Sequence, residues 1–94
     1  MVFHVPAGQP LQEALYRGHR VRRFDGFRAQ AERRLQILDS AVGLEDLKRL
    51  QSNRFAALSG DRAGQFSIRI NLQWRVCFEW LEDGPRNVEI TDYH

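Results

Sequence analysis

The 94-residue sequence has a single cysteine, Cys77, and three histidines that lie far apart along the chain. One cysteine cannot form a disulfide within the chain, and scattered histidines do not provide the closely spaced ligands of a zinc site. No hydrophobic run approaches the length of a membrane-spanning helix, and the first residues lack the basic and then apolar layout of a secretory signal. We therefore expect a soluble, cytoplasmic protein with no metal, no small-molecule cofactor and no membrane contact.

Lysine is almost absent as well. Lys48 is the one lysine among fourteen basic residues, and the other thirteen are arginines, which favour planar, bidentate contact with phosphate or carboxylate groups. Seven arginines, including Arg22 and Arg23, fall within residues 17–34 against two acidic residues. This basic segment is either a surface for a polyanion such as RNA, with Arg22 and Arg23 among its contacts, or a solvated helix face.

The length and the plentiful apolar residues predict one small folded domain over residues 1–94. Residues 2–5 have the pattern of a short strand, and residues 11–17 have that of a helix. A longer helix is indicated by apolar residues that recur at spacings of three and four and share one stripe: Phe24, Phe27, Ala31, Leu35, Leu38 and Val42. Gly43 is placed to end this helix, and residues 44–50 predict a short helical turn or loop packed on the core.

Beyond a turn at residues 60–64, the period of the apolar residues changes from that of a helix to two. Residues 66–71, 74–80 and 87–91 alternate in this way and predict a three-strand antiparallel meander with one apolar face. Helices that cover this face would make an α+β domain, in which two helices pack on one face of a small antiparallel sheet.

The register of the first hairpin carries information about function. If this hairpin is centred on Leu72, its apolar residues meet one another, and Arg69 stands directly opposite Arg75. Two like charges that face each other on a sheet are destabilising unless an anion or a carboxylate lies between them. The pair is therefore a predicted phosphate site, and nearby acids such as Asp61 or Glu79 are the alternative partners of the two arginines.

The second hairpin extends this prediction. Centring its turn on Gly84 again matches apolar residues with each other and brings Tyr93 beside Arg75, so that two arginines and a tyrosine form a row across the polar face. The same register sets Glu79 opposite Glu89. That pair is unfavourable without a basic neighbour and counts against this alignment.

The sequence ends with an acid, a phenol and an imidazole directly after the last predicted strand: Asp92, Tyr93 and His94. His94 is suited to proton transfer, because the unperturbed pKa of a histidine is about 6.5. Isolated residues at a frayed terminus would have no such role. Together with the arginine row, however, they predict an active site in which Arg69 and Arg75 stabilise negative charge.

Several blocks of the sequence have a familiar order and spacing. The stretches 53–71 (NRFAALSGDRAGQFSIRIN), 73–78 (QWRVCF) and 88–94 (VEITDYH) resemble the HigB-type toxins of the RelE/ParE superfamily, also known as the plasmid maintenance system killer family. The similarity extends back through residues 44–47 and 22–24. It therefore covers most of the chain.

This resemblance implies the toxin of a bacterial type II toxin-antitoxin system. HigB toxins of this superfamily are metal-free endoribonucleases that cut mRNA on the translating ribosome, and a helix-turn-helix antitoxin of the HigA type silences them. The family fold is a small antiparallel sheet with two helices against one face. By position, Asp92, Tyr93 and His94 match the terminal active-site motif of the family, whereas Arg62 and Arg75 match basic positions that line its RNA-facing surface.

Two positions depart from the family pattern. Many relatives carry a lysine where this chain has Ser59, and a polar or basic residue where it has Ala56, on a loop beside the active site. The loss of a cation there predicts weaker stabilisation of the transition state. Two alternatives to an active nuclease therefore stand: a weakened relative that binds RNA or sequesters antitoxin, and a ParE-like toxin that binds DNA gyrase without cutting RNA.

Overall fold

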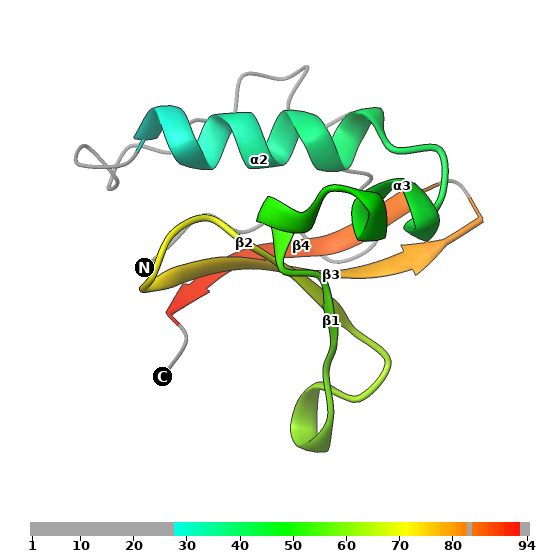
Figure 1. Cartoon of the computed structure of the whole chain (residues 1–94). Coiled ribbons are helices and arrows are strands. Elements are labelled where there is room, and N and C mark those ends of the chain that lie inside the picture. The colour runs from blue at the N-terminus through cyan, green and yellow to red at the C-terminus, as the bar shows by residue number, and fades with distance from the viewer. Residues whose placement is uncertain (1–27, 83, 93–94) are drawn as a thin grey trace.

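The computed structural model describes residues 28–82 and 84–92, which form an α+β structure (Figure 1). The helices lie on one side of an antiparallel sheet, as the sequence predicted. The described elements follow one another as α2 (Arg28–Ser40), α3 (Leu44–Arg49), the 3₁₀ turn η1 (Gln51–Asn53), β1 (Ala56–Ala57), the 3₁₀ turn η2 (Gly60–Arg62), β2 (Phe66–Arg69), β3 (Trp74–Leu81) and β4 (Gly84–Asp92). The predicted strand at residues 2–5 and the predicted helix at residues 11–17 lie outside the described residues.

The four described strands form one sheet in the order β1-β2-β3-β4, and each strand pairs antiparallel with the next. The last three strands are the predicted meander. Strand β1 was not predicted, because a strand of two alanines is too short to show an alternating pattern. Ala56 pairs with Ser67 and Ala57 pairs with Phe66, so that β1 is an edge strand beside β2.

The first hairpin has the predicted register. Phe66 pairs with Phe78, and Arg69 pairs with Arg75. Asn71 shapes the turn between the two strands, because its side-chain oxygen accepts hydrogen bonds from the backbone amides of Gln73 (2.8 Å) and Trp74 (2.9 Å). The apolar pairing therefore specified this register correctly, and the two arginines do face each other.

The predicted register of the second hairpin is wrong, by two residues at Arg75 and by three at Glu79. Arg75 pairs with Thr91 rather than with Tyr93, and Glu79 pairs with Arg86 rather than with Glu89. The strands close at the pair of Leu81 with Gly84, and β4 carries one extra residue against β3 between Cys77 and Glu79. The prediction assumed an unbroken ladder with a turn centred on Gly84. The strands instead close at Leu81 and Gly84, and the bulge moves the alignment by one residue.

Two residues with positive φ make this shifted register possible. Gly84 has a φ of +108°, which a glycine adopts without the steric penalty of a side chain, and Asn87 has a φ of +53° in the left-handed region. The Asn87 side chain donates a hydrogen bond to the Glu79 carboxylate across the hairpin. The shift also removes the unfavourable Glu79–Glu89 pair that the predicted register contained.

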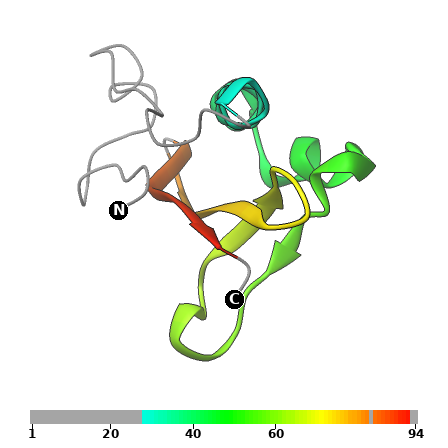
Figure 2. The same ribbon diagram turned by 90° about the vertical axis from the view of Figure 1, so that its left-hand side faces the viewer.

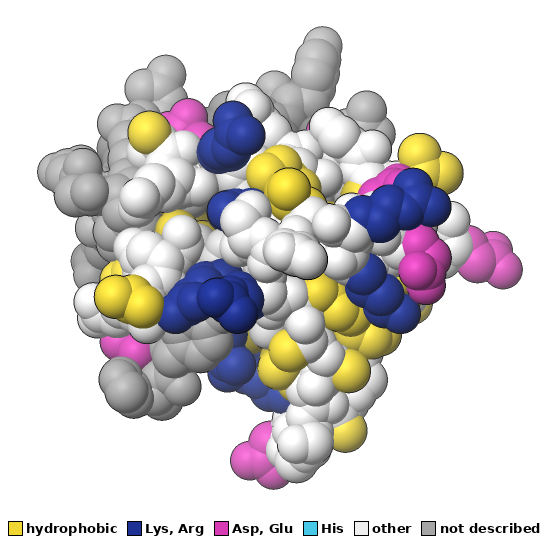
Figure 3. All heavy atoms as spheres, viewed as in Figure 1, with side chains coloured by type: hydrophobic (Ala, Val, Ile, Leu, Met, Phe, Trp, Pro, Cys, Tyr) yellow, Lys and Arg dark blue, Asp and Glu magenta, His cyan; other side chains and the backbone are white. Residues whose placement is uncertain are grey.

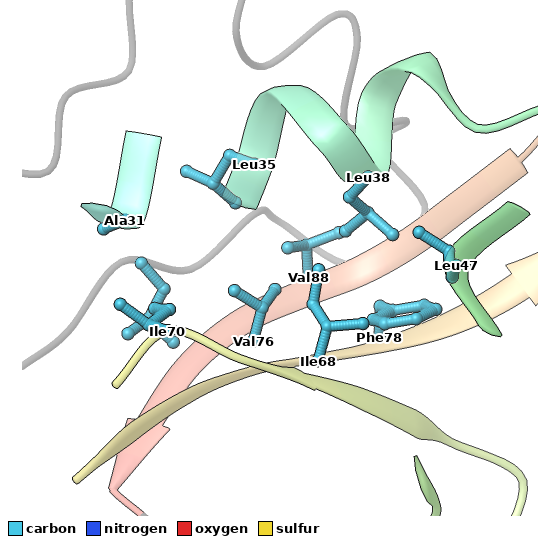
Figure 4. Packing of buried hydrophobic residues seen from close by; sticks show 10 residues of the cluster. Ala31, Leu35, Leu38, Leu47, Ile68, Ile70, Val76, Phe78 and Val88 are labelled. Carbon is cyan, nitrogen blue, oxygen red and sulfur yellow. The ribbon is translucent and has the colours of Figure 1, made fainter. Parts of the chain in front are cut away.

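The hydrophobic core lies between the helices and the sheet. Figure 4 shows Leu35 and Leu38 of α2 pointing toward Val76 and Val88 of the sheet, and all four side chains are buried. The predicted helical stripe is thus confirmed at Ala31, Leu35 and Leu38. Phe24 and Phe27 lie outside the described residues.

The end of this stripe was predicted wrongly. The helix α2 ends at Ser40, and the Val42 side chain, assigned to the core face, is 91% exposed. Gly43 does not end α2 but stands at the N-cap of α3 in an extended conformation. The predicted short helical segment is confirmed as α3, whose Leu47 is fully buried, whereas Leu50 after it is 41% exposed.

A buried amide fastens the two helices to the loop that enters the sheet. Asn53 is fully buried, accepts a hydrogen bond from Arg34 Nη1 of α2 (2.6 Å) and donates one to the backbone oxygen of Leu47 in α3 (3.0 Å). Burial, and then the nearby charge of Arg33, lower the pKa of the Arg34 guanidinium. Among the helices in the described part of the chain, none has the length and apolar character needed to cross a membrane.

Candidate functional site

The candidate site lies on the face of the sheet that α2 and α3 leave open (Figure 2). Because side chains alternate along a strand, the residues between the core positions of β2, β3 and β4 point to this second face. The pairing of the strands arranges them in two rows: Ser67, Cys77 and Glu89 form the first, and Arg69, Arg75 and Thr91 form the second. The second row is called the arginine row below.

The arginine row lies at the end of the sheet where β4 leads into the last residues of the chain. Both arginines are half-buried. Arg69 Nε donates a hydrogen bond to the backbone oxygen of Asn71 (3.2 Å), and Arg75 Nε donates one to Thr91 Oγ1 (3.4 Å). The Cys77 thiol lies 3.4 Å from the same hydroxyl oxygen. In each arginine, the hydrogen bond of Nε thus helps to hold the side chain in position.

Arg62 reaches this face from η2, which hangs from the side of the sheet opposite the helices (Figure 1). Its guanidinium donates to Gln65 Oε1 (2.9 Å) and forms an ion pair with Glu89 Oε1 of β4 (3.1 Å). Both charged side chains are about one third exposed, at 34% and 31%. Water therefore screens the pair, and we expect it to contribute no more than about 1 kcal/mol to stability.

The first row explains a second feature of this face. Ser67 and Cys77 are buried although the helices lie on the other side of the sheet. They are the short side chains of a row whose last member, Glu89, is bound by Arg62 from the loop before β2. This ion pair links the loop before β2 to β4. The thiol of Cys77 is therefore an interior group rather than an accessible one.

Asp92 does not join the arginines. It pairs with Trp74, and the alternation of β4 places it on the side of Ile90, opposite to that of Thr91. Its Oδ2 accepts a hydrogen bond from Gln73 Nε2 (3.0 Å) in the turn between β2 and β3. Of the predicted site residues, the structure brings together Arg69 and Arg75, keeps Arg62 nearby in an ion pair, and sets Asp92 on the other face.

The other predicted site residues are not described. Tyr93 and His94 follow the last described residue of β4, and Arg22 and Arg23 precede α2. Their predicted roles stay predictions. Among the residues that the structure does describe, no group of three or more His, Cys, Asp and Glu side chains is placed to share a metal ion.

The two departures from the family pattern lie beside this face. Ala56 belongs to β1, pairs with Ser67 and is exposed. Ser59 is also exposed and precedes η2, where its backbone oxygen accepts a hydrogen bond from the Arg62 amide (3.2 Å). Neither side chain carries a charge, so the positive charge of the described open face comes from arginines.

Sequence reasoning missed two residues that position these arginines. Thr91 accepts the hydrogen bond of Arg75, and Glu89 binds Arg62. Glu89 was noticed only as an unfavourable neighbour of Glu79, because the predicted register of the second hairpin was wrong. The extra residue of β4 could have been suspected from Asn87, since asparagine is one of the few residues that tolerate a positive φ.

Comparison with known proteins identifies the family. The profile of the HigB-like toxins, described as the RelE-like toxin of the type II toxin-antitoxin system HigB, matches residues 16–94. The chain belongs to this family. Toxin HigB-1 of Vibrio cholerae serotype O1 (strain ATCC 39315 / El Tor Inaba N16961) is 44% identical over 61 residues, which are 65% of this chain and 64% of that protein.

A second relative of this HigB-like chain is the Endoribonuclease HigB of Proteus vulgaris, which is 34% identical over 61 residues, 65% of either protein. The chain thus spans just under two thirds of the length of the curated relatives that it matches. The family match itself includes every described element and both members of the Arg69–Arg75 pair.

Proposed function

We propose that this chain is the toxin of a bacterial type II toxin-antitoxin system, a metal-independent endoribonuclease that cuts mRNA on the ribosome in the cytoplasm. The proposal treats residues 1–94 as one toxin domain. The observation that carries it is the pairing of Arg69 with Arg75 on the open face of the sheet. The name of the Proteus vulgaris relative supports an RNA-cleaving activity.

Electrostatics explains why this pair indicates a phosphate. Side chains directly opposite on antiparallel strands have Cβ atoms about 4.5–5.5 Å apart, and like charges there destabilise the sheet. Arg69 and Arg75 nevertheless adopt this arrangement, and both are half-buried. A phosphodiester between them would relieve the repulsion and would accept hydrogen bonds from both guanidinium groups. The pair is therefore arranged for a ligand that is negatively charged.

The reaction that fits this surface uses the nucleophile of the RNA itself. The ribose 2′-oxygen attacks the adjacent phosphorus and forms a 2′,3′-cyclic phosphate, while the bond from phosphorus to the 5′-oxygen breaks. A base accepts the proton of the 2′-hydroxyl, and an acid donates a proton to the departing 5′-oxygen. Arg69 and Arg75 stabilise the negative charge that develops on the phosphoryl oxygens.

The proton transfers fall to the end of the chain in this proposal. His94 is the residue best suited to exchange protons near neutral pH. Tyr93 would hydrogen-bond the phosphate or stack on a base. Because Asp92 lies on the face away from the arginines and binds Gln73, we assign it to orienting or charge-balancing the imidazole rather than to contacting phosphate.

The proposed partners are a helix-turn-helix antitoxin of the HigA type, the ribosome and mRNA. The description of the matching family, a toxin of a type II toxin-antitoxin system, supports an antitoxin partner. The basic residues Arg22 and Arg23, with Arg62 and Arg69, would supply contacts to RNA phosphates.

A second candidate function has an observation in its favour. Ala56 and Ser59 are exposed beside the open face and carry no charge. A toxin without cations at these positions would bind RNA or antitoxin but cut more slowly, by roughly tenfold to a hundredfold, because a group that stabilises charge in the transition state is lost. No feature of the described residues favours the gyrase-binding alternative.

Brief induction in bacteria that lack an antitoxin, with the 5′ ends of all transcripts mapped, tests the proposal. We expect new ends within translated frames, absent in His94→Ala and strongly reduced in Arg75→Ala. Arg49→Ala is the matched control, because Arg49 lies in α3 with an exposed side chain paired to Asp46. This variant should cut as the unaltered protein does.

The same experiment separates the alternatives. Growth arrest without new transcript ends would reject the nuclease assignment and point to gyrase or another target. Absence of any effect, with the protein folded and binding RNA, would indicate that Ala56 and Ser59 mark a weakened toxin. Full cleavage by His94→Ala would remove that residue from the chemistry.

A further inference from the structure

Arg54 has a backbone conformation that an arginine rarely adopts. Its φ of +47° and ψ of +50° place it in the left-handed region, where residues with a Cβ atom meet steric strain. Its side chain is exposed, so the strain is not offset by burial of the side chain. Non-glycine residues held in this way persist when their surroundings over-determine them, and they cluster at functional sites.

The neighbours of Arg54 on both sides are fixed. Asn53 before it is fully buried and hydrogen-bonded to both helices. Phe55 after it stacks on Phe66 with ring centroids 5.5 Å apart. The Arg54 amide itself donates to the backbone oxygen of Gln51 (3.1 Å). The backbone is thus held on both sides of Arg54, whereas the Arg54 side chain is exposed to solvent.

The register of the sheet places Arg54 at the same end of the β1–β2 pair as Arg69. Ala56 pairs with Ser67, Arg54 lies two residues before Ala56, and Arg69 lies two residues beyond Ser67 and faces Arg75. Arg54 therefore directly precedes the edge of the sheet, at the end that carries the arginine row.

The Arg54 guanidinium has no hydrogen bond or ion pair with another residue in the described part of the chain. Figure 3 shows Lys and Arg side chains gathered below α2, near the end of the sheet where the turn between β2 and β3 lies. Beside Arg54 there is an open hollow of about 370 Å³, lined by Gln51, Ser52 and Arg54. Its lining offers an amide, a hydroxyl and a cation, which suit the sugar and phosphate of a nucleotide.

We propose that Arg54 is an RNA-binding residue that holds a phosphate of the substrate strand next to the one bound by Arg69 and Arg75. This inference rests on the proposed function and adds a subsite to it. The bound strand runs along the arginine row toward β1, and the adjoining nucleotide enters the hollow at Gln51 and Ser52. The exposed Arg54 cation also supplies positive charge two residues from Ala56, whose own side chain is uncharged.

The dependence of binding on salt tests the subsite directly. The probe is a short single-stranded RNA with 2′-O-methyl groups throughout, which cannot be cut because its 2′-oxygens carry no proton. For single strands, each phosphate contact contributes about 0.7 to the slope of log K against log salt. We expect Arg54→Gln to weaken binding at low salt and to reduce that slope by about 0.7.

Arg49→Gln is the matched control, because it removes the same charge from an exposed arginine on α3. Its slope should equal that of the unaltered protein. Arg54→Lys should restore the slope of the unaltered protein, since it keeps the charge. An equal fall in slope for Arg49→Gln and Arg54→Gln would mean general attraction by net charge, and it would overturn the subsite.

A glycine at the same position separates binding from folding. Glycine adopts the φ of +47° without strain, so Arg54→Gly should unfold at the same temperature as the unaltered protein or at a higher one. Its RNA affinity should nevertheless fall as far as that of Arg54→Gln. A variant that loses stability and keeps its affinity would show a structural role and would overturn the proposal.

Arg75→Gln distinguishes this inference from the proposed function. If Arg75→Gln lowers the slope and Arg54→Gln does not, the RNA-binding face stands and the Arg54 subsite is rejected. If the unaltered protein fails to bind the probe, both are rejected. If both variants lower the slope, both stand.

Discussion

The two faces of the same sheet differ in almost every physical respect. The face under α2 and α3 is apolar, and its central residues Ile68, Val76 and Phe78 are fully buried. The open face carries hydroxyls, a thiol, carboxylates and two arginines that face each other. One face thus buries apolar surface, which stabilises the fold, whereas the other brings two like charges opposite each other.

This difference teaches how a small domain separates stability from chemistry. Because successive residues of a strand point to opposite faces, a residue of the core and a residue of the candidate site are direct neighbours along the chain, as Val76 and Arg75 are. The core therefore positions the site without contributing a side chain to it. Substitutions on the two faces should have different and separable effects.

The largest effect should follow from Phe78→Ala on the covered face. Phe78 is fully buried and lies against Phe66 and Trp80, with ring centroids 6.1 and 6.5 Å away. The cavity and the lost burial should reduce the free energy of unfolding by about 3–5 kcal/mol, as measured by urea denaturation. Leu72→Ala is the control, because Leu72 is 86% exposed and should change stability by less than about 0.5 kcal/mol. A small loss for Phe78→Ala would mean that this face is not the main core.

A smaller loss of stability is expected from substitution of Asn53, which hydrogen-bonds to both helices over that face. Asn53→Ala leaves the backbone oxygen of Leu47 without its donor and Arg34 without its acceptor. We expect the free energy of unfolding to fall by about 1–3 kcal/mol in thermal or urea denaturation. The exposed neighbour Gln51 serves as control, and Gln51→Ala should leave stability unchanged. Equal effects for the two variants would show that the buried amide does not fasten the helices.

A substitution on the open face should change stability in the opposite direction. Arg69→Gln removes one of two like charges that face each other, and the amide keeps a donor for the backbone oxygen of Asn71. Stability should stay constant or rise by about 0.2–1 kcal/mol, while RNA cleavage falls. Arg86→Gln is the comparison, because Arg86 faces Glu79 and its loss should not stabilise the protein. A clear destabilisation by Arg69→Gln would show that this arginine serves the fold.

The smallest effect is expected at a residue that the helical pattern assigned to the covered face. Val42 is 91% exposed beyond the end of α2, so Val42→Ser should change the free energy of unfolding by less than about 0.5 kcal/mol. The same substitution at Leu38, which is fully buried, should cost several times as much. Comparable losses of unfolding free energy at both positions, measured by denaturation, would show that Val42 packs in the core.

Most of the fold within the described residues was predictable from local patterns. Residues of α2 that recur at helical spacing are buried, and the three alternating segments form the meander. The first hairpin was predictable to the residue, because a mismatch of one position would turn its apolar side chains to the wrong face. The end of α2 was not predictable in this way, since Val42 continues the period although the helix has stopped.

The candidate site was predictable only in part. Arg69 and Arg75 followed from the first hairpin, whose short turn keeps the ladder regular. The assignment of Tyr93 as the partner of Arg75 failed, because it depended on the second hairpin. The position of Asp92 on the opposite face does not depend on this error, because a shift of two residues keeps each side chain on the same side of the sheet.

The sequence by itself determined the α+β class, the covered face of the sheet and the family of the chain, because these depend on the periods of apolar residues and on short contiguous motifs. Tertiary structure alone decided the bulge in β4, the ion pair of Arg62 with Glu89 and the strained backbone of Arg54. These features join residues that are far apart in the chain or that depend on how neighbours are clamped. No local pattern records such relations, because their energies arise only when the segments meet.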